Sequence, residues 1–427
     1  MLLGAVLRRA AVVVVAAAVG AGAAMLAEAS SPPKQPGPGP RMKTNISYQP
    51  VTFAQIPSWE EDDHAAAFKT FRKSCDRVLA AARDRATAEK VPPPAPPPLA
   101  LVAACEAASR QTGAVTKAGA KAFFEQHFTP NAVVHTGPNG LLTGYYEPLL
   151  TGSRTPQGEY QTPIYKRPPD LVNLIDETQR GAVGMTLTHA RKTDAGVEPY
   201  ATRAAIEQGA LKEKNLELMY LTDPVEVFFL QIQGSGRVRL TDGSFVRVHY
   251  DGKNGHPYSS IGRYLMDKGL LAADKVSMGA LKQWLKADPE RGKKVMWQNA
   301  SYVFFRELKG AEQAKGPLGA MQIPLTPGRS LAVDPGHHAL GLPIYVSAAG
   351  MKHVNKAGVF NRLMVAQDVG SAIKGPERGD IYFGSGDAAG RLAGVTKHAG
   401  KFIVLLPNDT PARADASGKA APEKARP

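Results

Sequence analysis

The N-terminal part of the chain carries apolar residues at the three- and four-residue spacing of amphipathic helices. This spacing predicts one helix over residues 58–88 and a second over residues 99–111, separated by the proline-rich run 91–98. Acidic residues near the start of the first segment favour a helix N-terminus there. We therefore predict an N-terminal helical region over residues 45–118.

The pattern changes near Ala120, where short β-type runs replace the helical spacing. Residues 120–134 predict a helix that leads into a strand, and residues 141–171 alternate short apolar runs with turn residues. The last third of the chain contains five more apolar runs, separated by Gly, Pro and Asp clusters, which are typical of a small closed barrel. These runs cover residues 321–335, 342–348, 361–368, 379–386 and 401–407.

The middle of the chain mixes the two patterns. Residues 200–220 have apolar positions at helical spacing and predict one or two surface helices, and residues 256–292 predict further helices. Residues 223–255 predict two β runs of hairpin type, and residues 297–308 predict another strand. The chain as a whole is therefore predicted to be mainly β with additional helices.

The first 29 residues have the pattern of an export signal. An arginine pair precedes seventeen apolar residues, and a small-x-small sequence follows at residues 27–29. An uncleaved anchor is the alternative, although a membrane span needs about 20 apolar residues. Residues 30–44 are predicted to be a linker and residues 408–427 a disordered tail. Because the first cysteine is Cys75, we do not expect a lipidated N-terminal cysteine.

The charge narrows the class of partner. The 427 residues include 52 Lys and Arg against 38 Asp and Glu, a formal net charge of +14. This excess suggests an anionic partner. The sequence has no helix-turn-helix, zinc-finger or RNA-binding aromatic motif, so we do not expect nucleic acid. An anionic cell-wall polymer or a membrane fits better with an exported protein.

The only two cysteines, Cys75 and Cys105, fall on the two predicted N-terminal helices. In an exported protein they predict a disulfide that joins the helices into a hairpin. In a cytosolic protein they would instead be two unrelated free thiols.

Two aspartates at the ends of apolar runs are the candidate catalytic groups. Asp368 ends one run and Asp380 begins the next, with Lys374 between them. A carboxyl partly removed from water can have a raised pKa and act as a general acid at neutral pH. The alternative is that both aspartates only cap strand ends and bind turn amides. Together with Asp334 they could form a cation site, but the nearby lysine and the lack of an EF-hand loop argue against metal.

Two other segments could bind a polar ligand. Tyr145 and Tyr146 lie in one turn with a glycine, a carboxylate and a proline, where aromatic rings can stack on sugars. Half-buried tyrosines that finish a strand are the plainer interpretation. Gln233 and Ser235 follow a very apolar run, which we predict to be a strand, and could present amide and hydroxyl groups. The alternative is a flexible glycine turn, and the context of a dinucleotide-binding loop is missing.

Seven segments between residues 120 and 407 form an ordered set: LTGYYEP, FFLQIQGSG, DGKNGHPYSSIGRYL, QNASYVFF, LAVDP, LMVAQDVGSAIKG and GDIYFGSGDAAGRLAG. Together they resemble the membrane-bound lytic murein transglycosylase A family. The resemblance implies a double-psi β-barrel into which a smaller β-domain is inserted, with glycan bound in the groove between them. The barrel would comprise residues 119–149 and 297–407, and the inserted domain residues 150–296.

The resemblance also implies an activity. Lytic transglycosylases cleave the β-1,4 bond of peptidoglycan between N-acetylmuramic acid (MurNAc) and N-acetylglucosamine (GlcNAc) without water, and leave a 1,6-anhydro ring. No cofactor is implied. Asp380 matches the aspartate of the family's GDIY-type motif and would be the single acid and base, with Asp368 as its neighbour. The substrate groove would be lined by Tyr145, Tyr146, Gln233, Ser235, Lys374 and Asp334.

Two other functions fit the same fold. A non-catalytic, expansin-like barrel would bind wall glycan without a protonated carboxylate, and a hydrolytic endoglucanase would need a base across the groove from Asp380. Peptidoglycan glycan strands are the expected partner, and proteins of cell-wall synthesis or division are left open. Members of the family are often lipid-anchored. This chain, whose first cysteine is Cys75, is expected in the periplasm, with association to the outer membrane or cell wall left open.

Overall fold

A computed structural model describes residues 46–87, 98–174 and 187–408. The predicted export signal and linker therefore lie outside the described residues, as does nearly all of the predicted tail. Within the described ranges, no helix combines the length and the apolar character that a membrane crossing requires.

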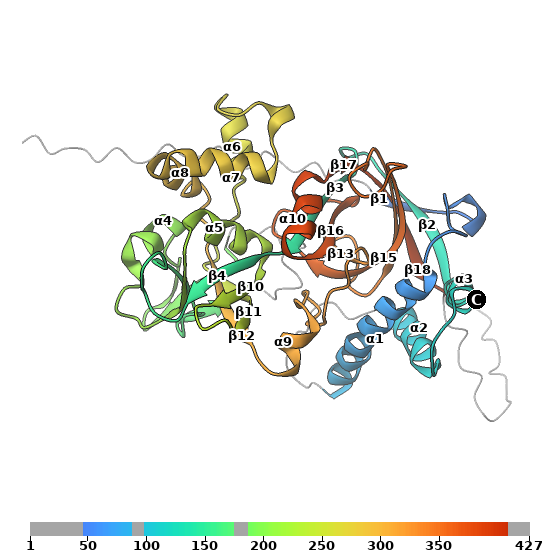
Figure 1. The fold of residues 1–427 in the computed structure, drawn as a ribbon. Helices are drawn as coiled ribbons and strands as arrows, with labels where there is room; N and C mark the ends of the chain where they lie inside the picture. Colours follow the sequence, from blue (N-terminus) through green and yellow to red (C-terminus); the bar gives the residue numbers. More distant parts are fainter. Residues whose placement is uncertain (1–45, 88–97, 175–186, 409–427) are drawn as a thin grey trace, which may run out of the picture. The chain divides into compact units, whose positions relative to one another are not determined.

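A nine-stranded sheet forms the larger half of the described fold, and Figure 1 shows the sheet curling round. Buried apolar side chains of its strands and of the N-terminal helices form one core. All five apolar runs of the last third contribute a strand, as predicted. The strand order is β1-β2-β18-β14-β15-β13-β16-β3-β17. The bounds are β1 Ile46–Pro50, β2 Phe128–His135, β3 Leu141–Glu147, β13 Ser330–Val333, β14 Pro343–Ala349, β15 Val359–Val369, β16 Arg378–Ser385, β17 Lys397–Ala399 and β18 Lys401–Pro407.

A second sheet of six strands is built from the middle of the chain, with order β12-β11-β10-β4-β9-β5. Its apolar cluster includes Ile164, Val238 and Phe305. A separate three-stranded sheet, β6-β7-β8, accompanies it. The bounds are β4 Leu149–Ser153, β5 Thr162–Tyr165, β6 Leu171–Asn173, β7 His189–Thr193, β8 Gly196–Glu198, β9 Glu217–Leu221, β10 Ser235–Leu240, β11 Phe245–Lys253 and β12 Val303–Leu308.

Strand β12 corrects one predicted boundary. We assigned residues 297–308 to the barrel, but β12 pairs antiparallel with β11 of the six-stranded sheet. The strand itself is present where the pattern placed it. Strand propensity does not say which partner a strand pairs with, so the sheet assignment could not follow from the pattern.

Helices pack against both sheets or lie in the segments that connect the strands. Their bounds are η1 Phe53–Gln55, α1 His64–Thr87, α2 Leu99–Arg110, α3 Lys117–His127, α4 Arg203–Ala205, η3 Ile206–Ala210, α5 Pro224–Gln233, α6 Ile261–Asp267, η4 Ala273–Lys275, α7 Met278–Ala287, α8 Pro289–Met296, α9 Ala311–Lys315 and α10 Gly386–Val395. The helices predicted over residues 200–220 are reduced to two short turns, α4 and η3, because the end of that segment enters strand β9.

Helix α5 overturns another prediction. Its residues were expected to form a very apolar strand, but they form a helix that begins and ends at recognisable signals. The Asp223 carboxylate accepts a hydrogen bond from the Val225 amide at 2.7 Å, and Pro224 occupies the first turn. Gly234 ends the helix at φ 78°, a left-handed conformation that favours glycine. These caps outweigh the strand propensity of the apolar residues between them.

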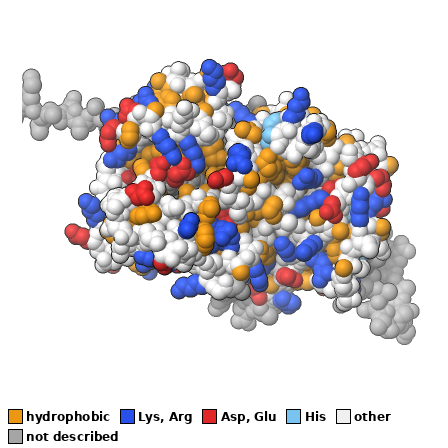
Figure 2. Space-filling model, in the orientation of Figure 1, with side chains coloured by type: hydrophobic (Ala, Val, Ile, Leu, Met, Phe, Trp, Pro, Cys, Tyr) orange, Lys and Arg blue, Asp and Glu red, His pale blue; other side chains and the backbone are white. Residues whose placement is uncertain are grey.

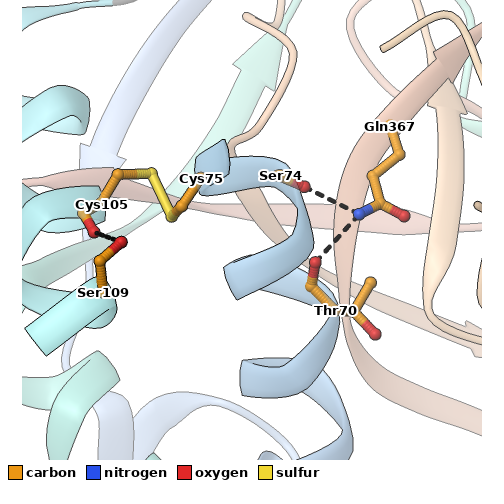
Figure 3. The surroundings of a disulfide bond; sticks show 6 residues. All are labelled: Thr70, Ser74, Cys75, Cys105, Ser109 and Gln367. Atoms are coloured by element: carbon orange, nitrogen blue, oxygen red, sulfur yellow. Dashed lines mark hydrogen bonds between the residues drawn. A yellow bond between two sulfur atoms is a disulfide. The ribbon is translucent and has the colours of Figure 1, made fainter. Parts of the chain in front are cut away.

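The N-terminal helices α1 and α2 are joined by the predicted disulfide between Cys75 and Cys105, which lies beside the nine-stranded sheet (Figure 3). Both sulfur-bearing residues are fully buried. Helix α1 begins at His64 rather than near residue 58. The Asp63 carboxylate accepts a hydrogen bond from the Ala66 amide at 3.0 Å, so this aspartate caps the helix from just outside it.

Two polar contacts fasten this helical region to the sheet. Gln367 of β15 donates from Nε2 to the Thr70 carbonyl at 3.0 Å and to Ser74 Oγ at 2.8 Å (Figure 3). Arg329 donates two hydrogen bonds to the Asp62 carboxylate, at 2.8 and 2.9 Å, and both side chains are buried. The N-terminal region is therefore part of the support of strand β15.

Removing the disulfide should destabilise this support. The bridge closes a loop with a sequence separation of 30 residues. In the chain-entropy model such a loop stabilises the fold by about 3–4 kcal/mol. We expect the double variant Cys75→Ala, Cys105→Ala to lose that much free energy of unfolding, measured by urea denaturation with oxidised and reduced wild type as controls. An unchanged free energy in both the variant and the reduced protein would contradict this role.

Candidate active site

The two candidate aspartates lie in one row across the nine-stranded sheet. Asp380 of β16 pairs with Ala332 of β13, and Ala332 also pairs with Asp368 on the other side. Thr143 of β3 pairs with Asp380 and extends the row. Side chains that pair across adjacent strands point to the same face. The small Ala332 side chain therefore leaves space between two carboxylates that share one face of the sheet.

A β-bulge brings Asp368 into this row. The pairing of β13 with β15 passes from Leu331 opposite Ala366 to Ala332 opposite Asp368, so Gln367 is an extra residue. Without the bulge, Gln367 would occupy the row and Asp368 would point to the opposite face. Instead the Gln367 side chain is held by α1 and by Ser330 Oγ, which donates to Gln367 Oε1 at 2.5 Å.

Asp368 is surrounded by hydrogen-bond donors. Its Oδ1 accepts from the Ala320 and Val369 amides, both at 2.9 Å, and its Oδ2 accepts from the Tyr145 hydroxyl at 2.9 Å. Burial raises the pKa of Asp368 to about 6, and the charge of Asp380 adds to this rise, whereas the three hydrogen bonds lower it. Both oxygens are occupied by donors, an arrangement suited to a fixed carboxylate.

Asp380 has a different environment. Its Oδ1 accepts a hydrogen bond from Thr143 Oγ1 at 2.6 Å, and its Oδ2 has no hydrogen-bond partner among the described residues. Arg378 donates from Nη2 to the same Thr143 oxygen at 2.8 Å. Burial raises the pKa of Asp380 to about 6, although the Arg378 charge and the Thr143 hydrogen bond oppose the rise. The hydrogen bond from Thr143 orients the carboxyl, and the raised pKa suits it to transfer a proton near neutral pH.

Both aspartates line a cleft of about 560 Å³ whose opposite side comes from the six-stranded sheet and its loops. Tyr145, Gln233 and Ser235, which we predicted to line a substrate groove, also line this cleft. On the face drawn in Figure 2, Lys and Arg side chains are interspersed with Asp and Glu and do not form one continuous basic track. A cleft of about 560 Å³ falls within the range of volumes that ligand-binding sites commonly have.

Comparisons with known proteins show which family this chain resembles. Residues 141–306 match the domain family described as the MltA specific insert domain, and residues 329–406 match the 3D domain. A membrane-bound lytic murein transglycosylase A of Escherichia coli (strain K12) is 36% identical over 275 residues, which cover 62% of this chain and 66% of that protein, slightly less than two thirds. A protein of the same name from Vibrio cholerae is 32% identical over 283 residues, covering 65% of this chain and 68% of the relative.

Solved structures extend the similarity over more of the chain. The crystal structure of a membrane-bound lytic murein transglycosylase from Agrobacterium tumefaciens has a TM-score of 0.74 at 36% identity, and covers 84% of this chain and 98% of that one. MltA from Neisseria gonorrhoeae has a TM-score of 0.64 at 34% identity, covering 86% and 92%. The chain belongs to the membrane-bound lytic murein transglycosylase A family.

In this member of the transglycosylase A family, three of the predicted groove residues lie elsewhere. Tyr146 points to the opposite face of β3 from Tyr145 and packs against Ala389 and Ala393 of α10. Lys374 is half-buried in the loop between β15 and β16, but it does not line the cleft. Asp334 does not line it either, and its contacts show why.

The Asp334 carboxylate binds backbone amides of two loops. Its Oδ1 accepts a hydrogen bond from the Gly336 amide at 3.1 Å, and its Oδ2 accepts one from the Gly375 amide at 2.8 Å. The carboxylate thus ties the end of β13 to the loop that follows Asp368. Among the described residues, no group of three or more His, Cys, Asp or Glu side chains could hold a metal ion. The three-aspartate cation site considered from the sequence is therefore not formed.

Sequence reasoning missed two polar side chains beside the family's GDIY aspartate. Thr143 donates a hydrogen bond to Asp380, and Arg378 donates one to Thr143. Neither residue was among the predicted site residues. The signal for Thr143 was its position two residues before Tyr145, which places both on one face of a strand. The signal for Arg378 was its position two residues before Asp380 on the same strand.

Proposed function

We propose that this protein is a peptidoglycan lytic transglycosylase that cleaves the MurNAc–GlcNAc β-1,4 bond and forms 1,6-anhydro-MurNAc, with Asp380 as the single acid and base. The observation that carries this proposal is the Asp380 carboxyl, which has a pKa of about 6 and one oxygen held by Thr143 and lies in the wall of a cleft. Family membership supports it. An Escherichia coli relative with bound chitohexaose has a TM-score of 0.58 at 27% identity, covering 85% of this chain and 92% of the relative, which supports a glycan chain as the ligand.

The proposed reaction uses the Asp380 carboxyl twice, first as an acid and then as a base. Protonated Asp380 gives its proton to the glycosidic oxygen as the bond from MurNAc C1 to that oxygen breaks. The MurNAc O6 hydroxyl attacks C1, and the Asp380 carboxylate accepts the proton released from O6. The products are a GlcNAc hydroxyl and a 1,6-anhydro ring, and Asp380 is protonated again. An internal nucleophile has a high effective concentration, so a second carboxylate to activate water is not required.

Asp368 has a supporting part in this proposal. As a carboxylate fixed by three donors, it stabilises the positive charge that develops at C1 in an oxocarbenium-like transition state. Repulsion between two half-buried carboxylates also disfavours the state in which both are ionised. The Tyr145 hydroxyl holds Asp368 in place and lies in the cleft wall.

A hydrolytic enzyme is the second candidate because the opposite wall also supplies a carboxylate. Asp251 of β11 lines the cleft, and burial raises its pKa. An inverting glycosidase places its base across the substrate from its acid, with room for a water molecule between them. In a hydrolytic mechanism with Asp380 as the acid, Asp251 would be the base that activates water, because it is the carboxylate that the described residues place on the opposite wall.

The products decide between these functions. Purified peptidoglycan should be digested with the protein, and the released fragments analysed by mass spectrometry with and without borohydride. We expect 1,6-anhydro ends, which borohydride does not reduce. Reducing ends would establish a hydrolase, and binding without release would establish a non-catalytic wall-binding protein. Because its substrate is peptidoglycan, we place the protein in the cell envelope, where the export signal predicted from the sequence would direct it.

The proposal also predicts a pH dependence. Asp380 must be protonated to act, so kcat/KM should fall as the pH rises through about 6, by roughly tenfold per pH unit beyond it. The Arg378 charge lowers the pKa of Asp380, so Arg378→Gln should move this fall to higher pH. Arg378→Lys keeps the charge and serves as the control. A pH profile that Arg378→Gln leaves in place would show that Asp380 is not the titrating group.

A further inference from the structure

One buried ion pair contacts both places where the chain passes between the two sheets. The first passage runs from β3 to β4 and contains Glu147, which is fully buried. Arg247 of β11 donates from Nε to Glu147 Oε1 at 2.5 Å and from Nη2 to Glu147 Oε2 at 3.1 Å. This two-point contact joins the last residue of β3, in the nine-stranded sheet, to β11, which lies next to the edge strand β12 of the six-stranded sheet.

Arg247 also reaches the second passage, which leads from β12 to β13 through α9. Its Nη1 donates a hydrogen bond to the Gln313 carbonyl of α9. The Gln313 side-chain amide donates in return to the carbonyl of Phe245 on β11. Both connections between the sheets are therefore fastened to strand β11, and Arg247 takes part in each.

Glu147 is also fastened to the strand that carries Asp380. Ser385 Oγ donates to Glu147 Oε2 at 2.6 Å, and Ser385 pairs with Glu147 in the register of β16 and β3. On the other side, β11 continues from Arg247 to Asp251 and Lys253, which line the cleft wall opposite Asp380. The ion pair thus connects the strand of the candidate acid to a strand of the facing wall.

We propose that Glu147 and Arg247 are positioning residues, whose ion pair sets the spacing of the two cleft walls. The effect on catalysis rests on the proposed function, whereas the effect on spacing does not. Neither residue lines the cleft, so neither contacts the substrate. Lysine cannot reproduce the planar fork of arginine. A displacement of about 1 Å in an active site can cost ~10²-fold in rate, so loosening this contact should be visible in turnover.

The test uses Arg247→Lys, which keeps the charge but not the two-point contact. Spin labels at the exposed positions Arg239 on β10 and Lys397 on β17, each changed to Cys, report the distance between the sheets. We expect a narrow distribution of the label-to-label distance in the protein that carries only the two labelled cysteines. The same protein with Arg247→Lys should give a broader distribution. On peptidoglycan, kcat should fall about ten- to hundredfold, with a smaller change in KM.

Arg154→Lys is the matched control. Arg154 also pairs with a glutamate, Glu307, but the arginine is 49% exposed, and both residues belong to the six-stranded half of the fold. We expect this variant to keep the unaltered distance distribution and turnover. Should Arg247→Lys fail to fold, Glu147→Gln, which keeps the size and the acceptor for Ser385, takes its place in the same two measurements.

A narrow distribution together with turnover within twofold of the Arg154→Lys control would overturn the proposal. The distance measurement needs no product. If the wild type released no anhydro ends, the proposed function would fail, while the distances would still decide whether the ion pair sets the spacing. A change in kcat without a change in distance would also overturn the positioning role.

Discussion

Asp380→Asn is expected to lower the rate of release of anhydro fragments from peptidoglycan by ~10⁴-fold, the upper end of the range for general acid–base catalysis. The upper end applies because one group transfers a proton in both halves of the reaction. Asparagine keeps the size of the side chain and can still accept the hydrogen bond from Thr143, whose Oγ1 lies 2.6 Å from Asp380 Oδ1. It cannot donate a proton to the glycosidic oxygen. The loss is measured as the rate at which anhydro fragments are released in a single-turnover digestion of peptidoglycan.

Two controls separate this loss from unfolding and from weaker binding. Glycan binding should be largely retained, because the other lining side chains are unchanged. The variant should also be more stable than the wild type at pH 7. The folded-state pKa of Asp380 is about 6 against an ordinary value of 3.8, so the aspartate stabilises the fold below pH 3.8 and loses that contribution as the pH rises through 6. Asparagine does not ionise and avoids this loss. Full activity in a stable Asp380→Asn variant would show that the carboxyl only caps its strand.

The secondary structure was largely predictable where local signals decide it. The five apolar runs of the last third became β13, β14, β15, β16 and β18 because turn residues bound each run. The same reasoning failed at α5, where the apolar residues were predicted to form a strand, and Asp223 and Gly234 were not recognised as helix caps. It also could not assign β12 to its sheet, because pairing depends on residues far away in the sequence.

Candidate residues for the site could be proposed from the sequence, but the geometry that joins them could not. Asp368 and Asp380 were found from their positions at the ends of apolar runs and from the family resemblance. The bulge at Gln367 and the small Ala332 between the carboxylates are properties of strand register, which no local pattern reveals. Tyr146 was misplaced for the same reason, since only the register of β3 decides which of two adjacent tyrosines faces the cleft.

Asp368→Asn is expected to have the second largest effect, a fall in kcat of about 10²-fold, in the range for loss of one preorganised electrostatic group. The variant removes a negative charge close to the developing positive charge at C1, but leaves Asp380 able to transfer its proton. Without a neighbouring carboxylate, Asp380 ionises more easily, so the fall of kcat/KM should begin at lower pH than in the wild type.

Tyr145→Phe is the graded companion of this variant, because it keeps the Asp368 charge and removes only the donor 2.9 Å from Oδ2. A hydrogen bond to a charged group is worth about 1.5–3 kcal/mol, so the expected loss is roughly ten- to hundredfold and should not exceed that of Asp368→Asn. The predicted order of activity loss is therefore Asp380→Asn, then Asp368→Asn, then Tyr145→Phe. If Asp368→Asn abolished release of anhydro fragments while Asp380→Asn remained near wild type, the two aspartates would have to exchange roles. In that case Asp368, with Tyr145 as its hydrogen-bond partner, would be the acid.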